Sequence, residues 1–292
     1  MLGLELLDSR AVAVALDGAG RVVKRVAVEA SPDLGAAAIA ALDQVRQGAA
    51  DSVGIASATP DAPAIAAAVV AVGKRFPGVP SAASTSGVAA AVAESWLGVG
   101  RGFKDVVFFA VSEHATGGIV RDGHPIDGGH RRAASVSWLA LNPVEREDYR
   151  KIGCLEAEVA AAGIVRRLIW RIKSGDRSSV QNAAGGNLSA ITVDHILDGA
   201  RKGDGVSISI VRDTAKYLGM AAANLIVVTD PQILVLGGLM ATAADLFLEP
   251  VRIETTRRLP KPIVDVVTVA PATFKDDAPA IGAARLAAVA VQ

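Results

Sequence analysis

Residues 223–240 read ANLIVVTDPQILVLGGLM, and this stretch carries the clearest sign of the fold. Its first part continues a long run with helical spacing. The part ILVLGGL, at 233–239, is an uninterrupted apolar run that leads into a glycine turn, as expected of a strand buried inside a sheet. A helix followed by a buried strand predicts an α/β arrangement for this half of the chain.

The rest of the chain also alternates strand-like and helix-like runs. Strands are expected at 2–7, 11–17, 21–30, 52–58, 104–112, 117–126 and 263–270, with hairpin turns at DGAG and DGH. Helices are expected from about Pro32 to Gly48 and at 63–76, 155–173, 192–203, 206–228, 244–258 and 276–291. Asp277 is the expected N-cap of the last helix, and the polar stretch 174–187 is expected to be a loop.

This order falls into two successive halves, each of which starts with strands and ends in helices. We therefore predict two α/β domains with a cleft between them. The N-terminal lobe is expected at 1–110, and the C-terminal lobe, which includes a helical connector, at 111–292. The last helix is a candidate to pack back on the N-terminal lobe.

The composition sets bounds on compartment and partners. The 30 basic and 30 acidic residues cancel, so we expect neither nucleic acid nor a membrane as a partner. The alanine-rich runs stop short of the roughly 18 apolar residues that a membrane span needs, and no signal peptide is predicted. Cys154 is the single cysteine, which excludes an intramolecular disulfide and favours a reducing compartment. We expect a cytoplasmic protein.

Residues 84–96, STSGVAAAVAESW, form a second junction, in which a polar turn precedes small apolar residues at helical spacing. Open α/β proteins usually place their chemistry at strand-turn-helix junctions, because strand ends and helix N-termini converge there. The turn contains no carboxylate, histidine or cysteine. This absence suggests a fold whose catalytic groups have been replaced.

Several stretches resemble the ROK family of bacterial sugar kinases and sugar-responsive repressors. They are GCLEAEVA at 153–160, the run at 223–240, DDAPAIGAARLAA at 276–288, GRGFKDVVFFAV at 100–111, GGIVRDGHPIDGGH at 117–130 and the helical connector at 200–225. The resemblance covers nearly the whole chain. It implies the ATPase-like actin and hexokinase fold, with two ribonuclease-H-like lobes around a central cleft that takes ATP and a sugar, and it implies a homodimer.

The family's first phosphate loop reads Asp-x-Gly-Gly-Thr-Lys, and residues 5–10, ELLDSR, align with it. Glycine lets the backbone approach phosphate oxygens closely. By this resemblance Leu7 and Asp8 obstruct a phosphate through bulk and like charge. Arg10 keeps a positive charge there, and a solvated surface role is the alternative for it.

The family's second phosphate segment reads Gly-Thr-Gly-x-Gly-Gly-Gly, whereas residues 112–118 read SEHATGG. Gly117 and Gly118 are therefore the nucleotide-binding remnant of this segment. Gly237 and Gly238 are the remnant on the adenine side, for which tight strand-helix packing is the alternative. Glu113 would lie near a γ-phosphate and repel it, or else hold magnesium.

The family's catalytic turn reads Asn-Asp-Ala-Asn, and its aspartate takes the proton from the sugar hydroxyl. The aligned residues 85–88 read TSGV, so Ser86 holds the position of the base. Serine is no general base without an activating partner, so we expect no catalytic residue. Glu156 in GCLE is the remnant of the sugar side, although an acid is also favourable at a helix start. A long sugar-binding loop is missing between Ala58 and Ser84.

The family's zinc cage uses one histidine and three cysteines, which give a closed tetrahedral site. Residues 135–138 stand for the histidine segment and 147–154 for the cysteine segment, in which Cys154 alone remains. We therefore predict no zinc. The four histidines have no ligand spacing, so no other metal site is predicted.

Together these changes favour a ROK-like pseudokinase with a binding, regulatory or interaction role, no cofactor, and a sugar or nucleotide as candidate ligand. The alternative is an active ATP-dependent carbohydrate kinase that uses ATP and magnesium and has moved its catalytic groups to Glu5, Glu113 or Asp61. A third interpretation is a transcriptional regulator of the family. We disfavour it because a strand is expected from residue 2, with no winged-helix segment ahead of it.

Overall fold

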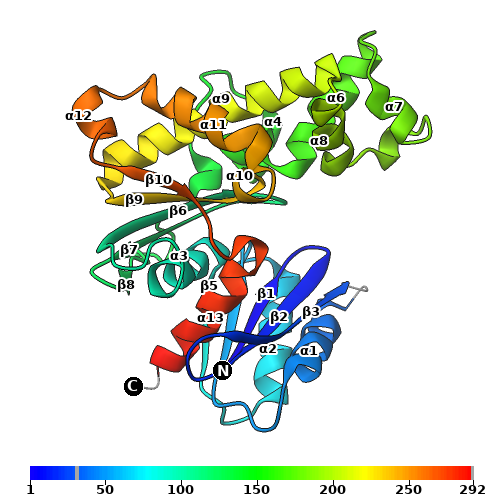
Figure 1. The fold of residues 1–292 in the computed structure, drawn as a ribbon. Helices are drawn as coiled ribbons and strands as arrows, with labels where there is room; N and C mark the ends of the chain where they lie inside the picture. The colour runs from blue at the N-terminus through cyan, green and yellow to red at the C-terminus, as the bar shows by residue number, and fades with distance from the viewer. Residues whose placement is uncertain (30–32, 291–292) are drawn as a thin grey trace. The chain divides into compact units, whose positions relative to one another are not determined.

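The computed structural model describes residues 1–29 and 33–290, and strands alternate with helices along the chain (Figure 1). The chain divides into two compact units. Unit 1 comprises residues 1–108, 116–134 and 272–292, and unit 2 comprises residues 109–115 and 135–271. The boundary predicted at residue 110 lies close to the end of the first segment of unit 1, which also takes in 116–134 and the last helix, the helix that the sequence made a candidate to pack back on the N-terminal lobe.

Unit 1 contains a five-stranded sheet in the order β3-β2-β1-β4-β5. Its strands are β1 (Leu2–Leu6), β2 (Arg10–Leu16), β3 (Val22–Glu29), β4 (Val53–Ser57) and β5 (Ser81–Thr85). β1 pairs antiparallel with β2 and parallel with β4, and β4 pairs parallel with β5. The carboxyl ends of β1, β4 and β5 therefore lie on one edge of the sheet.

Helices cover both faces of this sheet. α1 (Leu34–Val45) and α2 (Pro63–Arg75) share an apolar core with Leu4 of β1. Successive residues of a strand point to opposite faces, so Gly3 faces the other side. There α13 (Ala278–Val289) approaches so closely that a Cβ on Gly3 would lie 1.9 Å from the carbonyl oxygen of Ala280. α13 also packs against α3 (Ser86–Trp96), which explains why the last helix belongs to unit 1.

The second sheet has the order β10-β9-β6-β7-β8. Its strands are β6 (Asp105–Val111), β7 (Ala115–Arg121), β8 (His124–Pro125), β9 (Ile233–Gly238) and β10 (Thr268–Pro271). β9 is buried along its whole length, as its apolar sequence predicts, and it pairs parallel with β10. β7 pairs antiparallel with β8, which confirms the hairpin predicted at DGH.

The helices of unit 2 are α4 (Glu147–Ile152), α5 (Cys154–Val159), α6 (Ala161–Lys173), α7 (Ser179–Ala183), α8 (Val193–Arg201), α9 (Gly205–Thr229), α10 (Leu239–Thr242), α11 (Ala244–Thr256) and α12 (Lys261–Val264). The longer helices of unit 2, α6, α8, α9 and α11, lie where the sequence predicts helices. Short 3-10 turns lie at Val136–Trp138 and Leu188–Ala190, and a third, at Lys275–Asp277 in unit 1, precedes α13.

Several boundaries differ from the sequence predictions. The helix expected at 155–173 is broken, because Ala160 is extended and the chain turns so tightly that a Cβ on Gly163 would lie 2.3 Å from the carbonyl oxygen of Ala157. The expected loop at 174–187 contains α7, and the strand expected at 263–270 is α12 followed by β10. α1 has Asp33 as its N-cap, and the predicted start at Pro32 lies outside the described residues.

Asp277 lies at the predicted N-cap position of α13 but makes no capping hydrogen bond. Its Oδ1 accepts instead from Arg25 Nε at 2.6 Å, so the side chain links α13 to β3. Within the described part of the chain, no helix combines the length and the apolar character that crossing a membrane requires.

Candidate functional site

The tight turn between β1 and β2 takes the place of the expected first phosphate loop. Leu7 N donates to Arg10 O at 2.9 Å, which closes the turn. The Leu7 side chain is buried, and Asp8 is exposed. The turn therefore has a leucine with a buried side chain and an exposed aspartate where a phosphate loop has glycines.

Glu5 and Ser86 meet at the carboxyl edge of the first sheet. Glu5 lies near the end of β1 and is 6% exposed, and Ser86 opens α3 and is 2% exposed. Ser86 Oγ donates to Glu5 Oε1 at 2.7 Å. The start of α3 is capped by Thr85 Oγ1, which accepts from Val88 N. A buried carboxylate thus lies beside the residue that aligns with the family's base.

Glu5 and Ser86 are candidates from the sequence for separate reasons, and no sequence pattern predicts that they touch. The signal for their proximity was the parallel pairing of β1, β4 and β5, since residues at the carboxyl ends of parallel strands gather at one edge. Their separation of 81 positions along the chain hides this proximity from any local pattern.

The retained glycine pair lies where two backbones cross. A Cβ on Gly87 would lie 2.0 Å from Gly117 O, and a Cβ on Gly118 would lie 2.1 Å from Gly87 O. In unit 2, Gly238 has φ +57° and a Cβ there would lie 2.1 Å from Val111 O. Gly237 is buried at the end of β9. Close packing therefore accounts for Gly118 and Gly238 without a nucleotide.

In unit 2, Glu156 of α5 is tied to the start of β7. Its Oε2 accepts from Ala115 N at 2.9 Å, and its Oε1 lies 3.0 Å from His114 Nδ1. A backbone bond from Ala161 N to Ser112 O runs beside this contact. The sequence predicted a sugar-facing or helix-stabilising role for Glu156 and did not predict that the carboxylate holds the 112–115 loop.

The other proposed relocated carboxylates differ in setting. Asp61 is 83% exposed on its side chain and pairs with Arg132 at 3.1 Å, an exposed ion pair worth about 1 kcal/mol or less. Glu113 is half-buried in the 112–115 loop of unit 2. Glu5, by contrast, contacts Ser86 at the base position.

A second group of polar side chains, the Glu158 cluster, comprises Asn142, Arg146, Tyr149, Glu158 and Tyr217. Glu158 is 4% exposed, and its Oε1 accepts from the hydroxyl of Tyr149 at 2.5 Å and lies 3.3 Å from Arg146 Nη1. Asn142 Nδ2 donates to the Tyr149 hydroxyl at 3.1 Å and to Tyr217 at 3.4 Å. Burial, together with the hydrogen bond to Glu158, raises the pKa of Tyr149 to about 12.

The residues at the family's zinc positions do not fit a zinc ion. Positions 149 and 154 align with two of the family's zinc-binding cysteines. Here Tyr149 packs against Cys154, and the Tyr149 hydroxyl donates to Glu158. Glu147 is exposed and pairs with Lys151 at 2.7 Å, and Trp138 is exposed. In the ranges 1–29 and 33–290, three or more histidine, cysteine, aspartate or glutamate side chains nowhere gather as a metal-binding group.

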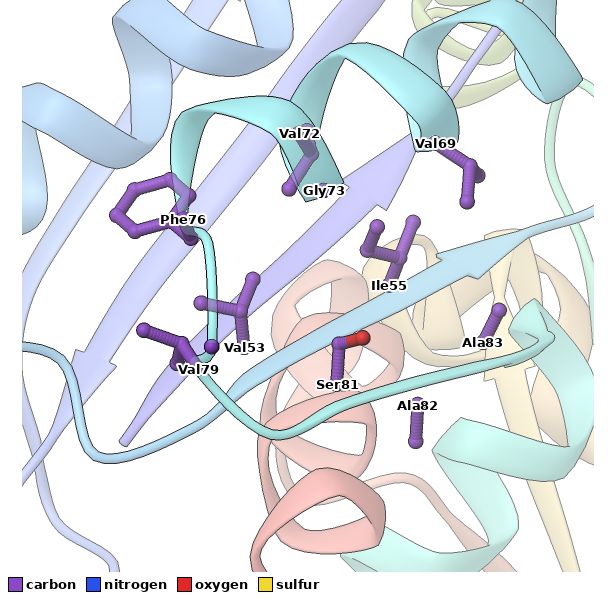
Figure 2. Close-up of a pocket in the computed structure, with 11 residues that line it drawn as sticks. Val53, Ile55, Val69, Val72, Gly73, Phe76, Val79, Ser81, Ala82 and Ala83 are labelled. Atoms are coloured by element: carbon purple, nitrogen blue, oxygen red, sulfur yellow. The ribbon is translucent and has the colours of Figure 1, made fainter.

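An apolar pocket of about 280 Å³ lies in unit 1 between α2 and strands β4 and β5 (Figure 2). Its walls include Val53, Ile55, Val72 and Phe76, and it is lined by no titratable side chain. It lies at the starting ends of β4 and β5, whereas Glu5 and Ser86 lie at the opposite edge of the sheet. This pocket lacks groups for acid-base chemistry.

Known proteins resemble this chain in sequence and in fold. A glucokinase from Halalkalibacterium halodurans is 28% identical over 66% of this chain and 59% of its own length, and one from Thermotoga maritima is 27% identical over 66% and 61%. The chain thus spans about three fifths of the length of these curated relatives. The DNA-binding transcriptional repressor Mlc of Escherichia coli is 24% identical over 57% of this chain and 40% of its own length.

The crystal structure of a ROK family glucokinase from Streptomyces griseus in complex with glucose and AMPPNP superposes with a TM-score of 0.86. The alignment covers 99% of both chains at 24% identity, which confirms the two-lobed actin and hexokinase fold. A ROK hexokinase from Thermus thermophilus has a TM-score of 0.73 over 100% of this chain and 99% of its own. The ROK family model matches residues 69–290. The chain therefore belongs to the ROK family, as the resemblance predicted.

Proposed function

We propose that this protein is a sugar-kinase-like member of the ROK family that acts by binding and does not transfer a phosphoryl group. The observation that carries the proposal is the buried contact of Ser86 with Glu5. The hydroxyl at the position of the base uses its hydrogen in a bond to Glu5, and the position itself holds no carboxylate that could take a proton from a sugar hydroxyl. A serine hydroxyl also titrates far from neutral pH.

The β1–β2 turn supports the same conclusion. Phosphoryl transfer depends almost wholly on positioning and on stabilising charge around the phosphate. The turn offers the buried side chain of Leu7 and the carboxylate of Asp8 in place of inward-facing glycine amides. A like charge beside a phosphate opposes both binding and transfer.

We assign ligand recognition to Glu156, with a sugar or a nucleotide as the small molecule. The relatives named as glucokinases and as an N-acetylglucosamine repressor make hexoses and their N-acetyl derivatives the first ligands to test. Both oxygens of Glu156 contact the 112–115 loop, so a sugar hydroxyl would share or displace these contacts.

The test combines two measurements on the purified chain. A coupled assay follows ADP release with ATP, magnesium and each of glucose, N-acetylglucosamine and N-acetylmannosamine, with the Thermotoga maritima glucokinase as positive control. Calorimetric titration then measures binding of each sugar and of ATP with magnesium into the millimolar range. We expect saturable binding of at least one ligand and no sugar-dependent ADP release. Sugar-dependent release of ADP would overturn the proposal.

The same contact favours a second candidate, an active ATP-dependent carbohydrate kinase in which Glu5 is the base. Glutamate at position 5 is one methylene longer than the family's aspartate, and it reaches the residue at the base position. If ADP release is observed, Glu5→Gln should abolish it and Ser86→Ala should not. A homodimer is proposed from the family likeness alone, and light scattering should then give about twice the 29.8 kDa of one chain. A cytoplasmic location is proposed from the single cysteine.

A further inference from the structure

Helix α5 carries two glutamates with different surroundings. It spans six residues, Cys154–Val159, and has no side-chain cap at its N-terminus. A helix this short is unstable on its own, because nucleation costs more than so few hydrogen bonds return. Its position must therefore come from contacts with neighbouring segments.

On one side of α5, Glu156 contacts the backbone of Ala115 and the ring of His114. A carboxylate that accepts from a backbone amide at 2.9 Å is oriented by that bond. Any displacement of α5 therefore moves this carboxylate relative to the 112–115 loop.

On another side, Glu158 anchors α5 to the helices around it. Tyr149 and Arg146, which reach Glu158 Oε1, come from α4 and from the residue before it, and Asn142 links Tyr149 to Tyr217 of α9. Arg166 of α6 adds a bond from its Nη2 to Ala157 O at 2.8 Å. Neighbouring segments thus bind α5 both at its backbone, through Ala157 O, and at the buried side chain of Glu158.

We infer that the Glu158 cluster is a metal-free positioning device that fixes α5 and thereby sets the Glu156 carboxylate against the 112–115 loop. The inference rests on the proposed assignment of Glu156 to ligand recognition. Glu158 is a positioning residue, since it acts through α5. A buried carboxylate whose partners are removed is strongly destabilised, so loss of the Tyr149 hydroxyl should loosen this helix first.

The experiment measures hydrogen exchange of the Ala115 amide, because that amide donates directly to Glu156 Oε2. Tyr149→Phe removes the hydroxyl and keeps the ring on Cys154 and Ala157, and Glu158→Gln removes the charge at nearly constant shape. Glu156→Ala removes the carboxylate and gives the exchange rate of the Ala115 amide without its hydrogen bond to residue 156. Lys151→Ala, on α4 but in an exposed ion pair with Glu147, is the matched control.

We expect Tyr149→Phe and Glu158→Gln each to speed exchange of the Ala115 amide about tenfold or more, while amides of β1 in unit 1 keep their protection. Lys151→Ala should leave the Ala115 rate unchanged. Unchanged exchange in both cluster variants, with faster exchange in Glu156→Ala, would overturn the inference. The readout uses no ligand and no turnover, so a failure of the proposed function leaves it interpretable.

Discussion

At the scale of single residues, Glu94 is the most deeply buried carboxylate of unit 1, at 0% exposure. Its Oε1 accepts from Phe274 N at 2.9 Å and its Oε2 accepts from Val99 N at 3.1 Å. The side chain thus joins α3 to the segment that leads into α13. Both backbone amides depend on it, and an unsatisfied buried amide costs about 1–3 kcal/mol.

Glu94→Gln should therefore lower the free energy of unfolding by about 2–3 kcal/mol, since the new amide group turns a donor toward one of the two backbone N–H groups. Urea denaturation followed by tryptophan fluorescence measures this change. Glu249→Gln, at an exposed position of α11, is the control and should stay within about 0.5 kcal/mol. Equal effects of the two substitutions would contradict the proposed role of Glu94.

At the scale of elements, α13 packs closely against α3 and β4 because glycines stand at the points of contact. A Cβ on Gly282 would lie 1.7 Å from Ala89 O, and one on Gly54 of β4 would lie 1.8 Å from Ala283 O. Gly282→Ala should destabilise unit 1 by about 3 kcal/mol or more, because two backbones would have to separate. Gly205→Ala in α9 meets no atom within 4 Å and should be neutral or stabilising. Thermal unfolding compares the two, and a tolerated Gly282→Ala would refute the close approach.

The long helix α9 depends on Asp204 at its N-cap. Partial burial pushes the pKa of Asp204 upward, but hydrogen bonds from the backbone amides of Ser207 and Ser179 outweigh it, so the pKa lies below its ordinary value of 3.8. Asp204 therefore stabilises the fold above pH 3.8, and this stability is lost as the pH falls through the lower folded value.

Asp204→Ala should cost about 1–2 kcal/mol at pH 6, and the difference from the parent chain should shrink below pH 4. Chemical denaturation at pH 6 and pH 3 checks both parts. Asp194→Ala, in the first turn of α8, should change stability by about 0.5 kcal/mol or less at either pH. A pH-independent difference for Asp204→Ala would mean that the carboxylate charge is not involved.

At the scale of the whole molecule, stability should not depend on a metal. By the resemblance, Tyr149 stands at a position where the family has a zinc-binding cysteine, and its hydroxyl bonds to Glu158, while the described residues contain no metal-binding group of three or more suitable side chains. Incubation with a chelator should leave the melting temperature unchanged, whereas a ROK protein with all four zinc ligands should melt earlier. A lower melting temperature together with one equivalent of released zinc would contradict this expectation.

The amino-acid sequence by itself determined the alternation of strands and helices, the buried strand β9, the DGH hairpin and the family, because these depend on patterns within short windows or on motifs in order. It also showed that the base position is Ser86. These features follow from local periodicity, to which side-chain burial is directly coupled.

Only the tertiary structure decided which residues meet. Three contacts join segments that are far apart in the sequence. They are the hydrogen bond of Ser86 with Glu5, the hydrogen bond of Glu156 with Ala115, and the close approach of Gly87 and Gly118. The break at Ala160 and the pairing of Asp277 with Arg25 likewise arise from packing that overrides local preference. A local pattern records which residues are apolar or small, whereas the choice of partner depends on how sheets and helices stack, which no short window of sequence contains.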